Sequence, residues 1–313
     1  MLSFLPSFIL APLNFVLFCL NLAVCGSLIF VGGLLKLLLK LVGLEKLVYR
    51  PMHAIYRCWA LNNYLIICLT NKVDWQISEP NALKKNGSYL IIANHQSWLD
   101  IMVISHLTRT RTPEPKYFLK ASLKKVPFLG MGCWALDMPF MHRYSKSFIA
   151  KNPHLKGKDV ETTRKSCLAF KDKPTAIINF VEGTRRSPEK AKKSKSAYKH
   201  LLTPRAGGIA FTLATLGEQF EKILDISIVY PANSGHIMMD ILKGKAKQII
   251  IDIKEVDILP ELIGDYDNNR QFRIDFQRWL NGIWQEKDER IDYLKVTANE
   301  TSANTTSTLV KSN

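Results

Sequence analysis

The sequence lacks the cysteine and histidine patterns that secreted and metal-binding proteins use. Its six cysteines contain no CxxC pair, and most of them stand inside apolar stretches, where a thiol behaves as a small hydrophobic side chain. The seven histidines are scattered, and none pairs with a nearby Cys, Asp or Glu at the spacing of a zinc site. We therefore expect reduced thiols on a cytosolic face and no bound metal.

Charge is absent from the first 35 residues of the chain. A membrane-spanning helix needs about 20 apolar residues, so this run is long enough, although Pro12 and Gly32-Gly33 offer places where it could bend. The segment predicts a membrane anchor, either one tilted span or a shallow helical hairpin. The alternative is the buried core helix of a soluble protein, but such helices rarely run this far without a charge on their solvent face.

A secretory signal is also missing, because the N-terminus has neither a basic region nor a small-residue cleavage site. We therefore expect the anchor to be retained. Basic residues follow it closely, and the positive-inside rule then places the rest of the chain in the cytoplasm. These residues are Lys36, Lys40, Lys46, Arg50 and Arg57. The next stretch, Val48–Thr70, mixes aromatic, apolar and basic positions, as a helix lying on a lipid surface does.

Positive charge dominates the rest of the chain. The formal net charge of +16 predicts an anionic partner, which could be nucleic acid, anionic lipid or a phosphorylated substrate. Part of this charge is a run from Arg185 to Lys199 that has serines between its lysines and few aromatic rings. RNA-binding surfaces usually offer rings on which bases stack. We therefore interpret the run as a solvated loop facing anionic membrane lipids, and expect no nucleic acid partner.

Short apolar runs alternate with amphipathic stretches after residue 87, which predicts an α/β fold with a layered mixed sheet flanked by helices. The expected strands are Ser88–Ala93, Lys116–Leu119, Ala176–Val181, Asp225–Tyr230 and Gln248–Ile253. The expected helices are Ile101–Leu107, Asp159–Phe170, Gly208–Glu218 and a terminal helix that contains Phe272 and Leu280. We divide the chain into an anchor (1–45), an interfacial connector (46–86), a catalytic domain (87–294) and a disordered tail (295–313).

The segment Ala93–Asp100 carries the clearest chemical signal. It follows an expected strand and precedes an apolar helix. On an ideal helix His95 and Asp100 would lie on different faces, so they can meet only where the chain turns between them. The carboxylate of Asp100 could then fix one imidazole tautomer of His95 and leave the other nitrogen free as a base. Such a pair suits deprotonating an alcohol while it attacks a thioester carbonyl.

Each residue of this pair could also have a purely structural role. His95 could be a locally bonded helix-entry residue, and Asp100 an N-terminal charge that the helix dipole favours. A short motif alone carries a high false-positive risk. Ser97 could be proposed as a nucleophile, but no GxSxG elbow is present to expose it.

Two further segments suggest anion binding. In Phe180–Arg185, Gly183 permits close backbone approach, Thr184 offers a hydroxyl, and Arg185 presents a planar fork suited to a phosphate. The alternative without a binding function is a β-turn with a solvated arginine. Arg143 closes an apolar stretch and needs a partner, which could be a substrate phosphate or a structural carboxylate.

Taken in order, these segments resemble the glycerophospholipid acyltransferase family, also called the 1-acyl-glycerol-3-phosphate acyltransferase family. Four blocks carry the resemblance, and they are Asn94–Asp100 for NHxxxxD, Lys120–Arg143 with its ending Phe140-Met141-His142-Arg143, Phe180–Arg185 and Val229-Tyr230-Pro231. The resemblance implies His95 as base, Asp100 as its orienting partner, and substrate binding by Arg143, Glu182, Gly183, Thr184 and Arg185. It also implies acyl-CoA or acyl carrier protein as co-substrate, with no cofactor and no metal.

Some positions depart from the family pattern. Asp137 stands where the second block commonly has Gly, His142 where it has Asp, and Val181 where the third block commonly has Pro. These departures leave the headgroup of the acceptor open. The sequences of Trp134–Met141 and Lys158–Arg164 resemble those of one bacterial inner-membrane subgroup, the YihG-type acyltransferases. This resemblance implies an inner-membrane location.

The leading hypothesis is a membrane enzyme that transfers a fatty acyl group to the free hydroxyl of a lysophospholipid such as lysophosphatidic acid, giving phosphatidic acid. One alternative keeps the fold but changes the acceptor to another lysophospholipid, a lipid A precursor or a similar anionic amphiphile. A second alternative is a non-catalytic basic membrane protein that binds nucleic acid or a protein partner. An oriented base argues against that alternative, since a binding module has no use for one.

Overall fold

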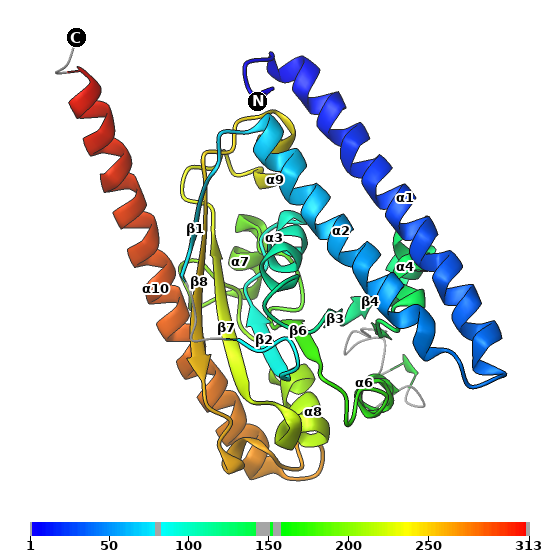
Figure 1. Cartoon of the computed structure of the whole chain (residues 1–313). Coiled ribbons are helices and arrows are strands. Elements are labelled where there is room, and N and C mark those ends of the chain that lie inside the picture. The colour runs from blue at the N-terminus through cyan, green and yellow to red at the C-terminus, as the bar shows by residue number, and fades with distance from the viewer. Residues whose placement is uncertain (1, 79–82, 142–150, 153–157, 311–313) are drawn as a thin grey trace.

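A six-stranded mixed sheet forms the centre of the molecule in the computed structural model, which describes residues 2–78, 83–141, 151–152 and 158–310 (Figure 1). The strands, in spatial order, are β1 (Asp74–Ile77), β8 (Gln248–Val256), β7 (Lys222–Val229), β2 (Tyr89–Ala93), β6 (Ala176–Phe180) and β3 (Pro115–Tyr117). Only the β7–β8 pair is antiparallel among the pairs of this sheet. The expected mixed sheet flanked by helices is confirmed.

Alternating side chains of the central strands face two separate cores. From β2, Tyr89 and Ile91 join the core under α2 (Lys46–Thr70), α3 (Leu99–Thr108) and α4 (Leu129–Ala135). Leu90 and Ile92 join the other core, under α6 (Lys158–Leu168), α8 (Ala206–Leu216) and α10 (Arg270–Val310). All five residues of β2 are buried, because a strand covered on both faces can carry a continuous apolar run.

Several elements differ from the sequence-based expectation. The expected strand Lys116–Leu119 is divided between β3 and a two-stranded ribbon of β4 (Leu119–Lys120) and β5 (Phe140–Met141), and β1 was not predicted. The basic run was expected to be a loop, but it contains helix α7 (Pro188–Ser194). Ser187 caps this helix by accepting a hydrogen bond from the Lys190 amide, and Pro188 suits its first position.

The N-terminal segment forms one continuous helix, α1 (Ser7–Lys40), which pairs with α2 as an antiparallel hairpin on one side of the sheet (Figure 1). The bends that Pro12 and Gly32-Gly33 could have allowed are not seen. At Gly33 an added Cβ would lie 2.5 Å from the Cβ of Ala135 in α4, so glycine permits the close approach of the two helices.

Helix α1 lies along the folded domain over most of its length. Near its start, Ser7 Oγ donates to the Lys243 carbonyl and Asn14 Nδ2 to the Leu242 carbonyl, at the end of α9 (Ile237–Leu242). Near its end, Lys36 Nζ donates to the Ala135 carbonyl at the end of α4. Ser7 and Lys36 are 29 positions apart, or about 44 Å along a helix.

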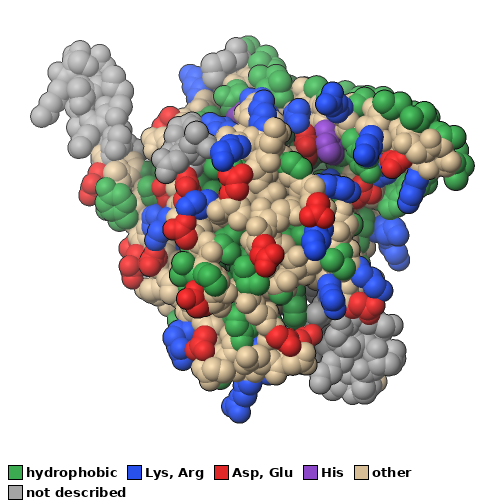
Figure 2. Space-filling model, turned by 60° about the horizontal axis from the view of Figure 1, so that its bottom comes forward, with side chains coloured by type: hydrophobic (Ala, Val, Ile, Leu, Met, Phe, Trp, Pro, Cys, Tyr) green, Lys and Arg blue, Asp and Glu red, His purple; other side chains and the backbone are tan. Residues whose placement is uncertain are grey.

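The outer face of α1 is apolar and exposed. Its exposed side chains include Phe8, Phe15, Leu20, Val24, Leu28, Val31, Leu35 and Leu38. By length and composition, this is the one helix among the described residues that could cross a membrane. Figure 2 shows hydrophobic side chains gathered along the upper right edge of the molecule, while acidic and basic side chains mix over the rest of the visible face.

Helix α10 extends beyond residue 295, the expected border of the catalytic domain. The helix continues to Val310, so it runs through most of the segment that we expected to be a disordered tail from residue 295. Helix α2 begins at Lys46, where the connector was expected to begin. The division of the chain into four parts stays a prediction.

Candidate active site

The turn between β2 and α3 brings His95 and Asp100 together, as the sequence predicted. His95 Nδ1 lies 2.8 Å from Asp100 Oδ2. Asp100 stands in the first turn of α3, where the helix dipole favours a negative charge. Its side chain is buried, while that of His95 is 15% exposed. The catalytic assignment of the pair remains a proposal, but the geometry that it requires is present.

Asp100 is held by more groups than the sequence suggested. Its Oδ2 atom also accepts hydrogen bonds from the backbone amides of Gln96, at 2.6 Å, and Ser97, at 2.9 Å. Its Oδ1 atom accepts one from the hydroxyl of Tyr230, at 2.7 Å. Charge-assisted hydrogen bonds of this kind stabilise a buried carboxylate. Sequence reasoning matched Tyr230 to a family block but gave it no role.

The His95 ring is fixed by stacking as well as by Asp100. It lies against Phe180 at the end of β6, with ring centroids 4.1 Å apart and an angle of 20° between the planes. Ala93 and Phe180 are directly paired, so the parallel register of β2 and β6 brings the two loops to the same edge. No hydrogen bond to His95 Nε2 is found within the described part of the chain, and this nitrogen is available to a reacting group.

Asn94 ties the turn to β7. Its Nδ2 atom donates to the Ile228 carbonyl at 2.9 Å, and its Oδ1 atom accepts from the Ile228 amide at 2.8 Å. Strand β2 ends at Ala93, and the Asn94 side chain continues its pairing with β7 by making two hydrogen bonds to the backbone of Ile228. The sequence placed Asn94 in the motif, but its function in anchoring the turn depends on a residue 134 positions away.

Glu182 contacts the protein backbone rather than open solvent. Its Oε1 atom accepts from the His95 amide and its Oε2 atom from the Leu202 amide, each at 2.9 Å. The side chain is buried, and burial raises the pKa of Glu182 to about 7, against the opposing effect of the two amides. The substrate-binding role that the sequence predicts for Glu182 stays a prediction, and both oxygens of this carboxylate accept backbone amides.

Arg185 belongs to the loop that follows β6, and Arg205 packs against Gly183 of the same loop. The guanidinium of Arg185 stands over the ring of Trp98, 4.9 Å from its centroid, and both residues are exposed. Arg205 packs against Gly183, where an added Cβ would lie 3.2 Å from Arg205 Cδ. Gly183 has φ +71°, which also favours glycine. Arg205 was not singled out from the sequence.

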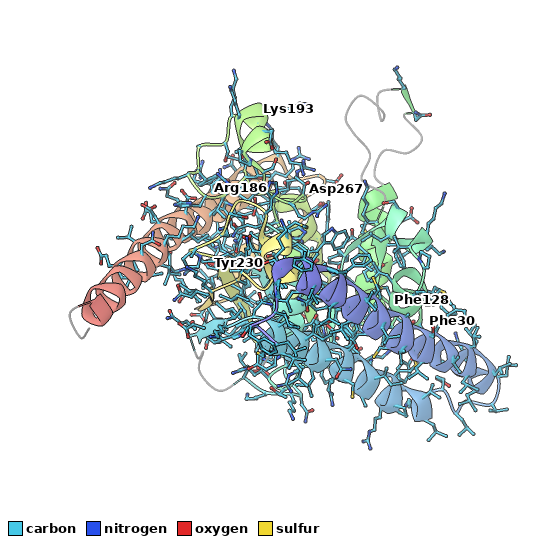
Figure 3. The ribbon with its side chains drawn as sticks, turned by 90° about the horizontal axis from the view of Figure 1, so that it is seen from above. Phe30, Phe128, Arg186, Lys193, Tyr230 and Asp267 are labelled. Carbon is cyan, nitrogen blue, oxygen red and sulfur yellow. The ribbon has the colours of Figure 1, made fainter. Side chains whose placement is uncertain are left out.

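The other predicted anion-binding residues are placed differently. Thr184 Oγ1 accepts a hydrogen bond from Lys190 Nζ at 2.7 Å, so its hydroxyl already has a cationic neighbour. Arg143 and His142 lie outside the described residues. Seen from above in Figure 3, Lys193 of α7 stands at the periphery of the molecule, whereas Arg186 lies further inside.

Asp137 has a structural explanation for its departure from glycine. Its φ of +59° is the left-handed conformation that glycine adopts most readily. The carboxylate accepts from Lys36 Nζ at 2.8 Å, and this ion pair ties α1 to the turn after α4. Lys36 was counted among the charges that orient the anchor, but its ammonium group is buried against this turn.

An apolar cavity of about 80 Å³ lies beside the turn between β2 and α3, and Trp98 of this turn is part of its lining. Its walls come from α1, α2, α3 and α4, and Tyr117, which also lines it, stacks on Phe180 with ring centroids 6.5 Å apart. Residues such as Ile29, Cys133 and Leu136 line it. Phe128, labelled in Figure 3, is also part of the lining, and its carbonyl oxygen would lie 2.8 Å from a Cβ added at Gly26 of α1. Among the described residues, no three His, Cys, Asp or Glu side chains are grouped as a metal ion requires.

Comparisons with known proteins agree with the block pattern. The model of the family described as Acyltransferase matches residues 74–229. The chain is 27% identical to the 2-acyl-1-lysophosphatidylinositol acyltransferase of Saccharomyces cerevisiae, over 66% of this chain and 60% of that protein. It is 34% identical to the 1-acyl-sn-glycerol-3-phosphate acyltransferase of the same organism, over 55% of this chain and 49% of that protein. The chain thus spans about half the length of these relatives.

The fold is shared with a solved structure. The crystal structure of the 1-acyl-sn-glycerophosphate (LPA) acyltransferase, PlsC, from Thermotoga maritima superposes with a TM-score of 0.55 and 14% identity. The match covers 90% of this chain and 96% of that one.

Proposed function

Because this chain belongs to the acyltransferase family through residues 74–229, we propose that it transfers a fatty acyl group to the free hydroxyl of a lysophospholipid. The single observation that supports this most is the His95–Asp100 pair, whose geometry leaves His95 Nε2 available. Acyl-CoA or acyl carrier protein is the proposed donor. Lysophosphatidic acid is the proposed acceptor, in phospholipid synthesis or remodelling.

The proposed chemistry uses His95 as a general base. The acceptor hydroxyl gives its proton to His95 Nε2 as its oxygen attacks the thioester carbonyl carbon. A C–O bond forms, the C–S bond breaks, and the proton passes from His95 to the departing thiolate. Asp100 keeps Nδ1 protonated and stabilises the imidazolium that forms. No covalent intermediate on the protein is needed.

Arg185 and Arg205 are proposed to bind the phosphate of the acceptor, together with Arg143. Arg185 is exposed and held over Trp98 next to the catalytic turn. Arg205 has no hydrogen bond or ion pair from its guanidinium to the rest of the described chain, so its donors are available to a ligand. Guanidinium groups bind phosphate oxygens in pairs, which favours Arg at such a site. Gly183 leaves room for Arg205, and Glu182 is proposed to position the backbone rather than to bind substrate.

The apolar cavity is proposed to hold part of the acyl chain of the donor. Tyr117 of its lining stacks on Phe180, which in turn stacks on His95, so the cavity lies near the proposed base. Burial in it would contribute about 0.8 kcal/mol per methylene group. Since Cys25, Gly26 and Ile29 of α1 form one wall, the helix that exposes apolar side chains outward also encloses the proposed acyl site.

The arrangement of α1 supports a position within one leaflet of the membrane. The catalytic domain contacts α1 from Ser7 to Lys36, a distance of about 44 Å. If α1 crossed a bilayer upright, the domain would be carried into the hydrocarbon core, which is about 30 Å thick. We therefore infer that α1 lies along the membrane surface with its apolar face in lipid. A bacterial inner membrane and a cytoplasmic catalytic domain complete the proposal.

The test is an assay of the purified full chain in mixed micelles with a panel of lysophospholipids, each with acyl-CoA and with acyl carrier protein as donor. We expect acyl transfer to at least one acceptor, highest with lysophosphatidic acid. His95→Ala should lose about 100- to 10,000-fold in turnover, with the donor still bound. Comparable turnover in wild type and His95→Ala would contradict the mechanism, and no transfer to any acceptor would contradict the function.

A further inference from the structure

The peptide unit of His95 is held on both sides by residues of the loop after β6. Its amide donates to Glu182 Oε1 at 2.9 Å, and its carbonyl accepts from the Arg186 amide at 2.7 Å. These bonds act on the backbone, so they fix the position from which the imidazole projects. The contacts with Asp100 and Phe180 then fix the orientation of the ring.

Both of these residues are fixed in turn by residues 199–202, which we name the strap. The Leu202 amide donates to Glu182 Oε2 at 2.9 Å. The Lys199 carbonyl accepts from Arg186 Nη2 at 2.8 Å. The two ends of the strap therefore contact Glu182 and Arg186, the two residues that hold His95. A displacement of the strap would shift the hydrogen bonds to both the amide and the carbonyl of His95.

The strap is held by α10. The Asp288 carboxylate accepts from the Lys199 amide at 2.8 Å and from the His200 amide at 2.7 Å, one on each oxygen. The indole of Trp284, one turn earlier, donates from Nε1 to the Leu202 carbonyl at 3.0 Å. Both side chains are buried, and a strap so short has no regular structure of its own to fix these groups.

Helix α10 itself is anchored to the central sheet beside the catalytic strands. Lys287 is fully buried, and its Nζ atom contacts Asp225 Oδ1 and the Ile226 carbonyl of β7, each at 2.7 Å. Arg290 contacts the other oxygen of Asp225 at 2.6 Å. Breaking a buried ion pair is costly, so these contacts specify one position of α10 on the sheet.

We propose that Asp288 and Trp284 of α10 are positioning residues for the catalytic base, acting through the strap, Glu182 and Arg186 on the backbone of His95. This proposal rests on the proposed function of His95. It assigns a role in the reaction to a helix that lies outside residues 74–229. A displacement of about 1 Å in a reacting group can cost about 100-fold in rate, so small movements of the strap matter.

The test compares Asp288→Asn with Asp275→Asn, which makes the same change on the exposed surface of the same helix. The side-chain amide introduced by Asp288→Asn would accept from only one strap N–H and would direct its own N–H groups at the other. We expect kcat to fall about 10- to 100-fold, with KM for donor and acceptor changed less than about twofold. Asp275→Asn should equal wild type in both constants.

A second readout separates this inference from the proposed function. In Asp288→Asn, amide hydrogen exchange should become faster in the peptides that contain His95 and Leu202, while peptides of β7 stay unchanged. This result is expected whether or not the correct acceptor has been found. If Asp288→Asn does not fold, Trp284→Phe keeps an aromatic ring but removes the donor to Leu202, and the same pattern is expected at smaller amplitude.

Two outcomes would overturn the inference. One is an active wild type with unchanged kcat and unchanged exchange at His95 in Asp288→Asn, since the strap would then not reach the catalytic turn. The other is a uniform rise in exchange and a uniform loss of melting temperature, since α10 would then stabilise the domain as a whole. A wild type without acyl transfer but with faster exchange at His95 in Asp288→Asn would contradict only the proposed function.

Discussion

The hydroxyl of Tyr230 donates a hydrogen bond of 2.7 Å to Asp100 Oδ1 from 130 positions further along the chain. Both side chains are buried, and the other oxygen of Asp100 faces His95. Burial and the adjacent carboxylate raise the pKa of Tyr230 well above its usual range, so this residue acts as a donor at every pH of interest. Tyr230 therefore fixes the carboxylate that fixes the base.

The first prediction concerns this contact. Tyr230→Phe should lower kcat about 10- to 100-fold, because a hydrogen bond to a charged group contributes about 1.5–3 kcal/mol. Asp100→Asn should be more severe, about 100- to 10,000-fold, because the amide can bind the wrong imidazole tautomer. Steady-state kinetics with both substrates provide the measurement. An Asp100→Asn variant milder than Tyr230→Phe would refute the order of importance.

The second prediction concerns the proposed phosphate ligands. Arg185→Ala and Arg205→Ala should each raise KM for the lysophospholipid by about ten- to a hundredfold, because each removes charge-assisted hydrogen bonds. KM for the acyl donor should be nearly unchanged. Lys in place of Arg should rescue only in part, since it lacks the bidentate fork. Arg278→Ala, on the exposed surface of α10, is the matched control. A rise in donor KM alone would reassign these residues to the donor.

The third prediction concerns the cavity. Cys133→Leu places a larger side chain in its wall and should shift the preferred donor to shorter acyl chains. Each methylene excluded from the cavity should cost about 0.8 kcal/mol, or about fourfold in selectivity. Cys58→Leu, at an exposed position of α2, should leave the preference unchanged. Competition between donors of different length is the measurement, and an unchanged preference in Cys133→Leu would show that the chain binds elsewhere.

The fourth prediction concerns pH and Glu182. Burial raises its pKa from 4.5 to about 7, so between these values the folded protein binds more protons at this site than the unfolded chain does. Its contribution to stability is therefore greatest below pH 4.5 and declines as pH rises to about 7, by roughly 3 kcal/mol. Glu182→Gln removes this titration. Thermal unfolding from pH 5 to 8 should show a shallower decline in Glu182→Gln than in wild type, and parallel curves would argue against the assignment.

The fifth prediction concerns the outer face of α1. A charge at Val31, which is half exposed on the outer face of α1, should weaken membrane binding, because burying an ionised carboxylate in lipid is costly. Wild type should stay with vesicles in about 1 M salt, because apolar insertion is not screened. Val31→Glu should partition into the soluble fraction, while Val31→Ala should remain bound. Sedimentation with vesicles distinguishes them, and equal retention of Val31→Glu would place the membrane contact on another surface.

The sequence predicted local features well where a short segment determines them. The strand before His95, the helix that begins near Asp100 and the turn between them depend on neighbouring residues, and the structure agrees. Contacts across the chain could not be predicted in this way. Tyr230 reaches Asp100 because β7 and β2 are neighbours in the sheet, and Leu202 reaches Glu182 from an irregular segment 20 positions away.

Asp137 shows a second reason why the sequence alone could not predict the structure. From the sequence it was only a departure from glycine in a family block. The structure shows a left-handed backbone at Asp137 together with an ion pair to Lys36. The cost of that conformation for a residue with a side chain is of order 1 kcal/mol, and a buried partner on α1 offsets it. No rule of local propensity contains that partner, since it lies 101 positions earlier.

Helix α1 forms one wall of the cavity, and under the proposed function this position affects how the substrate reaches the site. One face of this helix encloses the cavity and the other is directed outward as an apolar surface. A lysophospholipid would then arrive by lateral diffusion in the leaflet, and its acyl chain would not cross water. The relevant substrate concentration is in that case a surface mole fraction. Adding inert lipid or detergent at constant bulk lysophospholipid should slow the reaction by dilution in two dimensions.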